Sequence, residues 1–313
     1  MIAEQFIEEG HPKKSVLSIL GIPRSSYYYQ PVEAPLRRGI AKSEYTTLRF
    51  GGQVSNNQVI LDIEGLLGRE FVDYGYLKVT HWLRQQKDYV INPKKVYRLM
   101  SENKLLNKVV PKKKGKRNWV KELLPPTSKA FDYLEFDIKY FHVWGKNRNA
   151  LLLTVIDVHT RWVMGHYMAW GIKHPKVIAL FKQIFETYPL PSRFFVRNDN
   201  GSQFIAGDVM DFFNKKGVVQ EFCKPATPEQ NAHIESYHSI QEKVICQRYE
   251  FDSLEDARQT LNRFIYFYNF ERIHSGCDYY NPNHQLRKNC VTLDRQHLEN
   301  VFDSASTKLL FSN

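Results

Sequence analysis

Three acidic residues, Asp137, Asp199 and Glu235, have side chains and a spacing that could support metal-dependent chemistry. The second and third lie in two polar segments, residues 197–204 and 227–236, and thirty-five residues separate them. Phosphoryl transfer on DNA commonly uses two divalent metal ions held by carboxylates from separate elements. Magnesium prefers oxygen ligands and keeps several waters, so three carboxylates and a substrate phosphate are sufficient. The pattern therefore favours a metal-dependent enzyme that cuts and joins DNA.

Each acid taken alone has a simpler interpretation. Asp137 lies in an apolar strand candidate and would face water there, since a buried carboxylate needs a partner. Asp199 begins an Asp-Asn-Gly turn, although open α/β sheets also place ligands just beyond the carboxyl ends of strands. Glu235 lies in a helix candidate, where most glutamates are solvated. In this strand order and spacing, the three together make a stronger case for a shared site.

Other polar residues have weaker claims to a functional role. His238 lies one helical turn beyond Glu235, and a surface position is its favoured interpretation. Asp157 could add an acid near the site, but its segment is also an ordinary strand connection. Contact with DNA and packing against the core are equally open for a C-terminal aromatic segment that includes Tyr266, Tyr268, Arg272 and His274. The chain has no zinc ligand pattern, so free thiols are expected at Cys223, Cys246, Cys277 and Cys290.

The net charge of +11 is concentrated in the N-terminal part of this 313-residue chain. Residues 1–130 contain 23 Lys+Arg and 12 Asp+Glu, whereas the remainder is neutral overall. A basic region attracts polyanions such as DNA, but ribosomal and membrane-surface proteins are also basic. The chain has no apolar run long enough to span a membrane and no signal-peptide pattern, so we expect a cytoplasmic protein.

Two short helical patterns precede the acidic residues. In residues 1–60, Val16, Ile19 and Leu20 have helical spacing before Gly21, which is consistent with half of a helix-turn-helix. Residues 50–58 are expected to form a loop. Residues 61–110 predict a second helix-turn-helix-like module, with one amphipathic helix from Tyr76 to Leu83 and another that Asn92 caps. A plain helical hairpin with solvated lysines is the alternative.

Basic residues follow in and after this module. The second helix would bury Val96, Leu99 and Met100 and expose the candidate DNA contacts Lys94, Lys95 and Arg98. Residues 111–128 are predicted to form a basic linker that gains order on DNA, although a solvated surface loop is the alternative. Its candidate DNA contacts are Lys112, Lys113, Lys114, Lys116 and Arg117.

Residues 129–290 are predicted to form an α/β core with a mixed sheet, before a tail at 291–313. Strands are expected at 131–142, 151–158, 162–170, 193–197 and 218–222, and helices at 174–188 and 203–216. One long helix from about 229 to 248, entered through Pro228 and Asn231, would carry Glu235. Three strands followed by alternating helix and strand are typical of such a layered domain.

Several motifs resemble the DDE transposase and retroviral integrase superfamily, most closely the second-frame (OrfB) proteins of the IS-three family of bacterial insertion sequences. They are Asp-Asn-Gly-Ser-Gln-Phe from Asp199, Pro-Glu-Gln-Asn-Ala-His-Ile-Glu-Ser from Pro228, residues 267–275 with Asn281-Pro282, and Tyr74-Gly75-Tyr76 with the helices after it. The likeness covers most of residues 70–287 and a fragment near 15–30. The combination of motifs is highly specific.

The resemblance implies a ribonuclease-H-like core in which Asp137, Asp199 and Glu235 hold two Mg²⁺ or Mn²⁺ ions. It also implies cleavage at the ends of a DNA element, strand transfer into target DNA, action as a homo-oligomer on DNA, and a possible first-frame partner protein. In many relatives a basic residue follows the catalytic Glu by seven positions, but this chain has Glu242 there, with Lys243 as a candidate DNA contact beside it. A nuclease without strand joining and a DNA-binding protein derived from a transposase are the alternatives.

Overall fold

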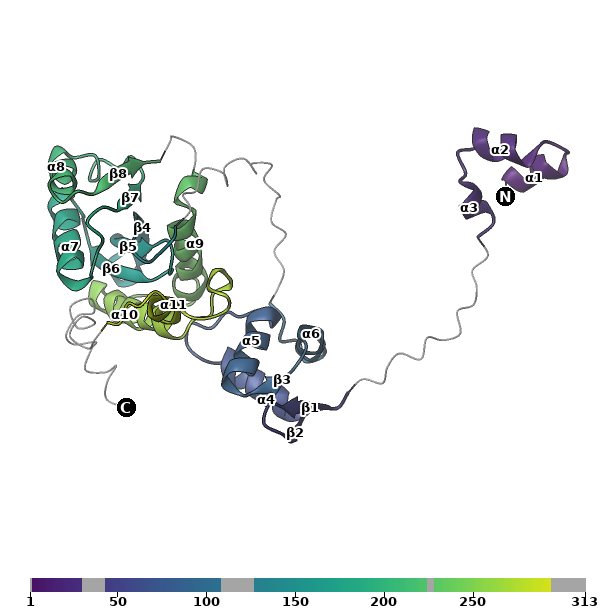
Figure 1. Cartoon of the computed structure of the whole chain (residues 1–313), viewed down its shortest axis with the longest axis horizontal. Coiled ribbons are helices and arrows are strands. Elements are labelled where there is room, and N and C mark those ends of the chain that lie inside the picture. The colour runs from purple at the N-terminus through teal and green to yellow at the C-terminus, as the bar shows by residue number, and fades with distance from the viewer. Residues whose placement is uncertain (1, 30–42, 108–126, 224–227, 294–313) are drawn as a thin grey trace. The chain divides into compact units, whose positions relative to one another are not determined.

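The computed structural model describes residues 2–29, 43–107, 127–223 and 228–293 (Figure 1). The predicted linker contacts between Lys112 and Arg117, and the tail beyond residue 293, lie outside these ranges. By its internal contacts the chain divides into two units, Met1–Glu44 and Tyr45–Asn313. The sequence had placed the first boundary near residue 60. No helix in the described ranges is long and apolar enough to cross a membrane.

The first unit contains three short helices, α1 (Ile2–Glu8), α2 (Lys13–Ile19) and α3 (Arg24–Tyr27). Its small core is formed by Ala3, Val16 and Leu17. Of the three residues with helical spacing, Val16 is buried, whereas Ile19 and Leu20 are exposed. Gly21 ends α2 as predicted, with a positive φ of 63° that favours glycine.

The second unit begins with a small antiparallel sheet and three helices. Strands β1 (Tyr45–Leu48), β2 (Gln53–Ser55) and β3 (Tyr89–Val90) pair in the order β2-β1-β3. The helices are α4 (Asn56–Leu67), α5 (Tyr76–Gln86) and α6 (Pro93–Glu102). The loop expected at 50–58 was therefore wrong in its second half, since β2 lies there and the Ser55 side chain caps α4. The predicted cap of α6 is confirmed, because Asn92 accepts a hydrogen bond from the N–H of Lys94.

A five-stranded mixed sheet forms the centre of the second unit, in the order β6-β5-β4-β7-β8. Its strands are β4 (Tyr133–Val143), β5 (Arg148–Asp157), β6 (Val163–Ala169), β7 (Phe195–Asn198) and β8 (Val219–Phe222). The first three are antiparallel neighbours, whereas β7 runs parallel to β4 and β8 parallel to β7. This order and direction confirm the ribonuclease-H-like fold that was predicted.

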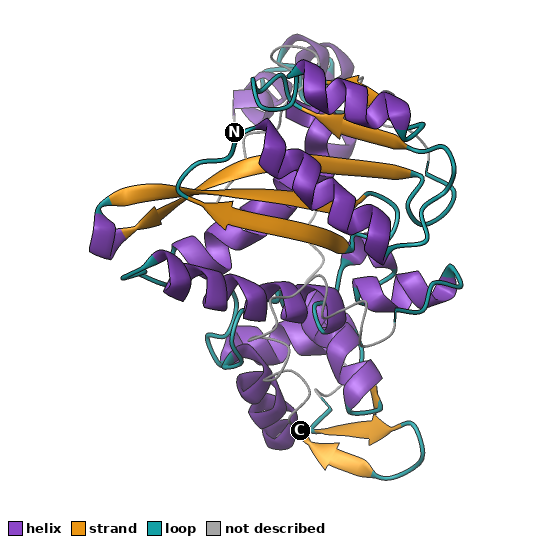
Figure 2. Cartoon of the chain, turned by 90° about the vertical axis from the view of Figure 1, so that its left-hand side faces the viewer, coloured by secondary structure: helices purple, strands orange, loops and turns teal. Residues whose placement is uncertain are grey.

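Helices cover both faces of this sheet (Figures 1 and 2). On one face lie α7 (His174–Thr187) and α8 (Gly207–Lys215), whose Phe181 and Phe213 pack against Phe136 of β4. On the other lie α9 (Ala232–Gln241) and α10 (Leu254–Phe270). Since side chains alternate along a strand, the neighbours of Phe136 in β4 point towards α9. A short 3-10 helix (Ser275–Cys277) and α11 (Pro282–Lys288) follow.

The helix predicted from about 229 to 248 is present from Pro228 to Cys246, but it is not a uniform α-helix. The segment is a 3-10 turn (Pro228–Asn231), then α9, then a π-helical turn (Glu242–Cys246). The buried side continues through the π-helical turn, where Val244 and Ile245, three and four residues after buried Gln241, are both buried. The apolar spacing along this segment predicts a buried stripe of Ile234, Tyr237, Ile240 and Val244. Three of these residues are fully buried, and Ile240 is half-buried.

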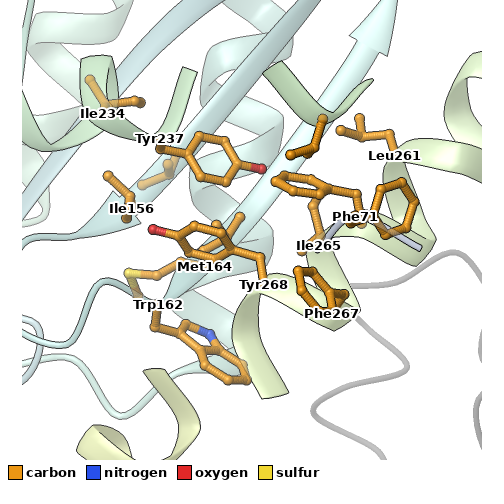
Figure 3. Packing of buried hydrophobic residues seen from close by; sticks show 14 of the residues in the cluster. Phe71, Ile156, Trp162, Met164, Ile234, Tyr237, Leu261, Ile265, Phe267 and Tyr268 are labelled. Carbon is orange, nitrogen blue, oxygen red and sulfur yellow. The ribbon is translucent and has the colours of Figure 1, made fainter. Parts of the chain in front are cut away.

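Apolar and charged contacts join the helices around α5 to the C-terminal part of the core. Phe71 packs edge-on against Phe264 and lies beside Phe267 of α10 (Figure 3). The hydroxyl of Tyr74 accepts a hydrogen bond from the N–H of Ile273 at 2.9 Å. These contacts fix the helical module against the core and account for the aromatic residues of α10 as packing residues.

Candidate active site

Asp137 lies at the middle of β4, on the side that faces α9. Its side chain is 22% exposed, so it is accessible but not fully solvated. Its Oδ2 lies 3.4 Å from Nδ1 of His238, one turn beyond Glu235 on α9. The expectation that His238 is a surface residue was wrong, because its side chain is only 12% exposed.

Asp199 follows β7, the strand parallel and adjacent to β4, and its carboxylate accepts a hydrogen bond from the N–H of Gly201 at 3.0 Å. Partial burial raises the pKa of Asp199, the Gly201 bond opposes this, and the negative charge of Asp137 raises the pKa further. The parallel pairing of β4 with β7, in which Glu135 lies opposite Arg197, puts the two carboxylates on neighbouring strands. A divalent cation between such groups would relieve their repulsion.

Glu235 lies in the first turn of α9 with an exposed side chain. Residues three and seven positions apart share a helix face, so Glu235 lies on the side of α9 that carries His238 and Glu242. Both of those residues contact β4, through Asp137 and Lys139 respectively. The fold thus places Asp137 and Asp199 on neighbouring strands and Glu235 on the helix that packs on β4, although no three His, Cys, Asp or Glu in the described ranges are grouped closely enough to hold a metal ion as placed.

Three alternate residues of β4 pair in order with residues along α9 and its π-helical end. Glu135 contacts His233, Asp137 contacts His238, and Lys139 contacts Glu242 at 2.8 Å. Two strand residues span about 6.6 Å and four or five helical residues about 6–7.5 Å, so the two elements advance at the same rate. We call these contacts the polar ladder.

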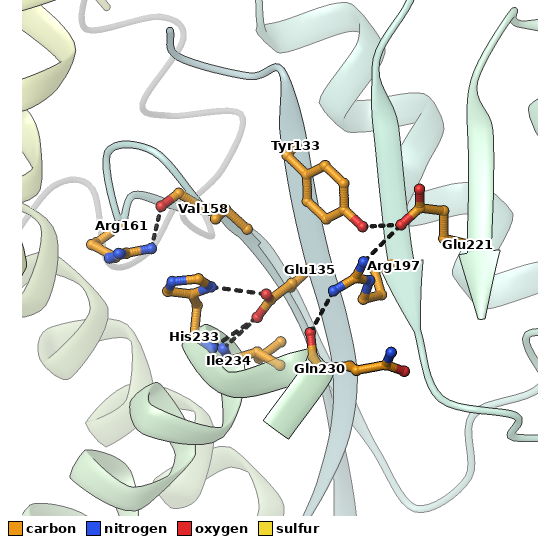
Figure 4. Close-up of polar contacts among 9 residues, drawn as sticks. All are labelled: Tyr133, Glu135, Val158, Arg161, Arg197, Glu221, Gln230, His233 and Ile234. Atoms are coloured by element: carbon orange, nitrogen blue, oxygen red, sulfur yellow. Dashed lines mark hydrogen bonds and ion pairs between the residues drawn. The ribbon is translucent and has the colours of Figure 1, made fainter. Parts of the chain in front are cut away.

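The contacts of the polar ladder differ in the charges that they bring together. Glu135 is only 1% exposed and accepts three hydrogen bonds, from the N–H of His233 at 3.0 Å, its Nδ1 at 2.9 Å, and the N–H of Ile234 at 2.8 Å (Figure 4). At the other end, the hydrogen bond from Lys139 lowers the pKa of Glu242, and burial opposes the shift. The carboxylate of Glu242 is thus paired with a lysine from β4.

Arg197 links the neighbouring strands to the entry of α9. It is 8% exposed, and its guanidinium donates to the carbonyl of Gln230 at 2.8 Å and to Glu221 at 2.9 Å (Figure 4). Tyr133 also donates to Glu221. Because Arg197 lies two residues before Asp199, this network connects the second acid to the segment that leads to the third.

The predicted DNA contacts have differing surroundings. Lys94 is exposed on α6, whereas Lys95 and Arg98 are half-buried and Lys95 donates to the carbonyl of Tyr45 at 2.7 Å. Lys243 pairs with Asp73 of the helical module at 3.1 Å. Asp157 is fully buried and accepts hydrogen bonds from Phe131 and Thr160, which confirms its interpretation as part of a strand connection.

Sequence reasoning missed Glu135, Arg197 and His233. An available signal was that Glu135 lies inside the same apolar strand as Asp137 and two residues before it, which puts both on one face. The cost of burying a carboxylate applies to Glu135 more strongly than to Asp137. The four cysteines are free, as expected.

Comparison with known families gives three adjoining matches. An HTH-like domain model matches residues 56–114, and two integrase core domain models match residues 127–228 and 216–282. Together the matches extend from the start of α4 to the start of α11.

The chain is also similar to proteins of insertion elements. It is 31% identical to the insertion element IS476 uncharacterized 39.2 kDa protein of Xanthomonas euvesicatoria, over 65% of this chain and 58% of the relative. It is 27% identical to the transposase for insertion sequence element IS904 of Lactococcus lactis, over 44% and 54% respectively. The chain therefore spans little more than half the length of these two relatives.

Among solved structures, the HTLV-2 integrase catalytic core domain in complex with magnesium is 14% identical, with a TM-score of 0.38. The alignment covers 52% of this chain and 97% of that chain. The family models, the insertion-element relatives and the strand order agree with the resemblance seen in the motifs. The chain therefore contains an integrase core domain preceded by an HTH-like domain, and it is similar to proteins of insertion elements.

Proposed function

We propose that this protein is a transposase that cleaves the ends of a DNA element and joins them to target DNA. The observation that carries the proposal is the placement of two acids on neighbouring strands: Asp137 lies on β4, and Asp199 directly follows β7, which runs parallel to β4 with Arg197 opposite Glu135. Glu235 supplies a third acid from the helix that packs on the strand of Asp137. Carboxylates so placed fit the oxygen preference of Mg²⁺ and Mn²⁺.

In this proposal Asp137, Asp199 and Glu235 hold two divalent ions. When bound, such ions activate the attacking oxygen and stabilise the leaving oxygen of a phosphodiester. The side chains of Asp137 and Asp199 provide fixed ligands from the sheet. Glu235, in the first turn of α9, would supply the third carboxylate. His238 holds the orientation of Asp137 from α9.

The same proposal assigns DNA binding to the basic HTH-like domain and the residues that follow it. Lys94, Lys95 and Arg98 of α6 would contact phosphates, and the residues between Lys112 and Arg117 would extend that contact. Strand transfer at paired element ends requires at least two active sites, so we expect a homo-oligomer on DNA. A first-frame protein could act as its partner, and bacterial cytoplasm is the expected location.

Strand transfer in vitro tests this function. The substrates are a labelled duplex with an exposed element-end 3′-hydroxyl and a plasmid target, with Mg²⁺ or Mn²⁺. The wild type is compared with Asp199→Asn and with Asp211→Asn, which changes an exposed aspartate on α8. Joined product from the wild type and Asp211→Asn, but not from Asp199→Asn, is the expected result.

Other outcomes identify the alternatives. Metal-dependent cleavage without joining would indicate a nuclease. Tight DNA binding that needs no metal and is unchanged in Asp199→Asn, with no reaction even after a first-frame protein is added, would indicate a DNA-binding protein derived from a transposase.

A further inference from the structure

We propose that Glu135 is a positioning residue: its buried carboxylate caps α9 from the neighbouring strand and so places Glu235 beside Asp137. The inference rests on the proposed function of the acidic site and concerns how that site is assembled. Three observations support it: the hydrogen bonds of Glu135, the burial of its carboxylate, and the absence of a side-chain capping hydrogen bond from Asn231 at the N-terminus of α9.

The N-terminus of α9 has no cap from its own sequence. Asn231 occupies the cap position, yet its side chain makes no capping hydrogen bond, and its Oδ1 is buried without a hydrogen-bond partner. The first N–H groups of a helix have no partner within the helix and need one from elsewhere. The prediction that Asn231 would define this helix entry was therefore wrong in its mechanism.

Glu135 supplies the missing cap. Its Oε2 accepts from the N–H groups of His233 and Ile234, the second and third residues of α9, and its Oε1 accepts from the imidazole of His233. A negative charge at a helix N-terminus is also stabilised by the helix dipole. These contacts explain how a carboxylate that is 1% exposed is accommodated inside the sheet.

The cap fixes where Glu235 lies along β4. Glu135 anchors α9 two residues before Glu235, and the contact of His238 with Asp137 anchors it three residues after. A helix held at two points along one strand has no freedom to slide or rotate between them. Glu235 is therefore held opposite the stretch of β4 between Glu135 and Asp137.

Three variants and one matched control test this role. Glu135→Gln keeps the shape of the side chain but removes its charge, and Glu135→Ala removes all three hydrogen bonds. His233→Ala removes only the imidazole contact and serves as the milder variant should the others fold poorly. Asp157→Asn is the control, because Asp157 is an equally buried carboxylate on β5 that accepts backbone N–H groups away from α9.

The first measurement is amide hydrogen exchange of the peptide that contains residues 232–236, which needs no metal and no DNA. In Glu135→Ala the amides of His233 and Ile234 should exchange about tenfold faster or more, because hydrogen bonds to charged groups are lost. In His233→Ala they should keep most of their protection. In Asp157→Asn they should match the wild type.

The second measurement is Mn²⁺ affinity by calorimetry, followed by strand transfer. Loss of an outer contact that orients a ligand lowers metal affinity or activity by about 10–100-fold, and we expect this for Glu135→Gln and Glu135→Ala. For His233→Ala the expected loss is about three- to tenfold, the equivalent of one hydrogen bond. Asp157→Asn should stay within about twofold, since it does not touch α9.

The results separate this inference from the proposed function. A wild type that binds Mn²⁺ and joins DNA, with Glu135→Gln and Glu135→Ala variants that do both equally well, would refute the positioning role alone. Equal losses in Asp157→Asn would also refute it, because they would reflect general destabilisation. A wild type that binds no Mn²⁺ and joins no DNA would overturn both proposals, even with a protected α9.

Discussion

Arg272 and Asp73 form a buried ion pair between the integrase core and the HTH-like domain, with 2.7 Å between Nη1 and Oδ1. The two side chains are 2% and 9% exposed. Lys243 follows Glu242 of the polar ladder in the chain. Its ammonium lies 3.1 Å from the other carboxylate oxygen of Asp73. The end of the α9 segment is therefore tied to the helical module through one aspartate.

This aspartate should make the protein sensitive to acid. Burial alone would raise the pKa of Asp73, but Arg272 and Lys243 outweigh it and lower the pKa from 3.8 to about 2. A lowered acid pKa contributes stability that is complete above the unfolded value and is lost as pH falls through the folded value. The contribution, about 2 kcal/mol, should therefore disappear between pH 4 and pH 2.

Urea unfolding at several pH values checks this prediction. Asp73→Asn should be less stable than the wild type at pH 6, and its stability should fall less between pH 4 and pH 2. The exposed-site variant Asp211→Asn should keep the wild-type slope. Parallel slopes for the wild type and Asp73→Asn would contradict the assignment.

The turn after β4 should tolerate no side chain at Gly145. A Cβ at this position would overlap the backbone of Asp252, whose segment packs directly on the turn. Gly145→Ala should therefore destabilise the protein by roughly 1–3 kcal/mol, since a backbone contact cannot give way as a flexible side chain can. Gly171→Ala is the control, because nothing lies within 4 Å of a Cβ there. Thermal unfolding that shifts equally for both variants would count against the contact.

Arg197 should be important for stability because its side chain is buried and donates hydrogen bonds to two partners. Arg197→Ala would leave the carbonyl of Gln230 without its donor and Glu221 without its cationic partner, although Tyr133 would still donate to Glu221. Breaking a buried charge pair by removing one partner costs about 3–5 kcal/mol, and partial exposure of Glu221 places the expected loss near 3 kcal/mol. Arg193 is exposed and lies two residues before β7, and Arg193→Ala should change the free energy of unfolding by less than about 0.5 kcal/mol. Chemical denaturation of both variants decides the point, and a small loss for Arg197→Ala would show that water replaces its contacts.

Glu242 should weaken DNA binding near the acidic site. Glu242→Gln would release the ammonium of Lys139 and remove one negative charge from a surface that meets phosphates. Affinity for duplex DNA should rise, and the dependence of log K on log salt should steepen by about 0.9 for one further phosphate contact. Glu186→Gln, an exposed change on α7, provides the control for net charge.

The double variant Lys139→Ala with Glu242→Gln identifies the source of any gain. If Lys139 makes the new contact, the steeper salt dependence should vanish in the double variant. If the steeper slope persists in the double variant, loss of the acid itself and not release of the lysine explains the effect. Fluorescence anisotropy over a range of salt concentrations supplies all of these values.

The sequence by itself determined the local elements and the candidate acids. The strands of the core, α5, α6 and the Asn92 cap followed from apolar periodicity and capping chemistry, which depend on residues near one another in the chain. The motifs that surround Asp199 and Glu235 were likewise contiguous, so they were visible without a fold.

Only the tertiary structure decided which residues support those acids. The hydrogen bonds of Glu135 with His233 span 98 residues, and that of Lys139 with Glu242 spans 103, so no local pattern encodes either. The break in the predicted long helix has the same origin, because Glu135 caps α9 at the position where the 3-10 turn ends. A carboxylate that is removed from water needs hydrogen-bond donors from the element that packs against it. Glu135 finds them in α9, and it therefore anchors the helix that carries Glu235.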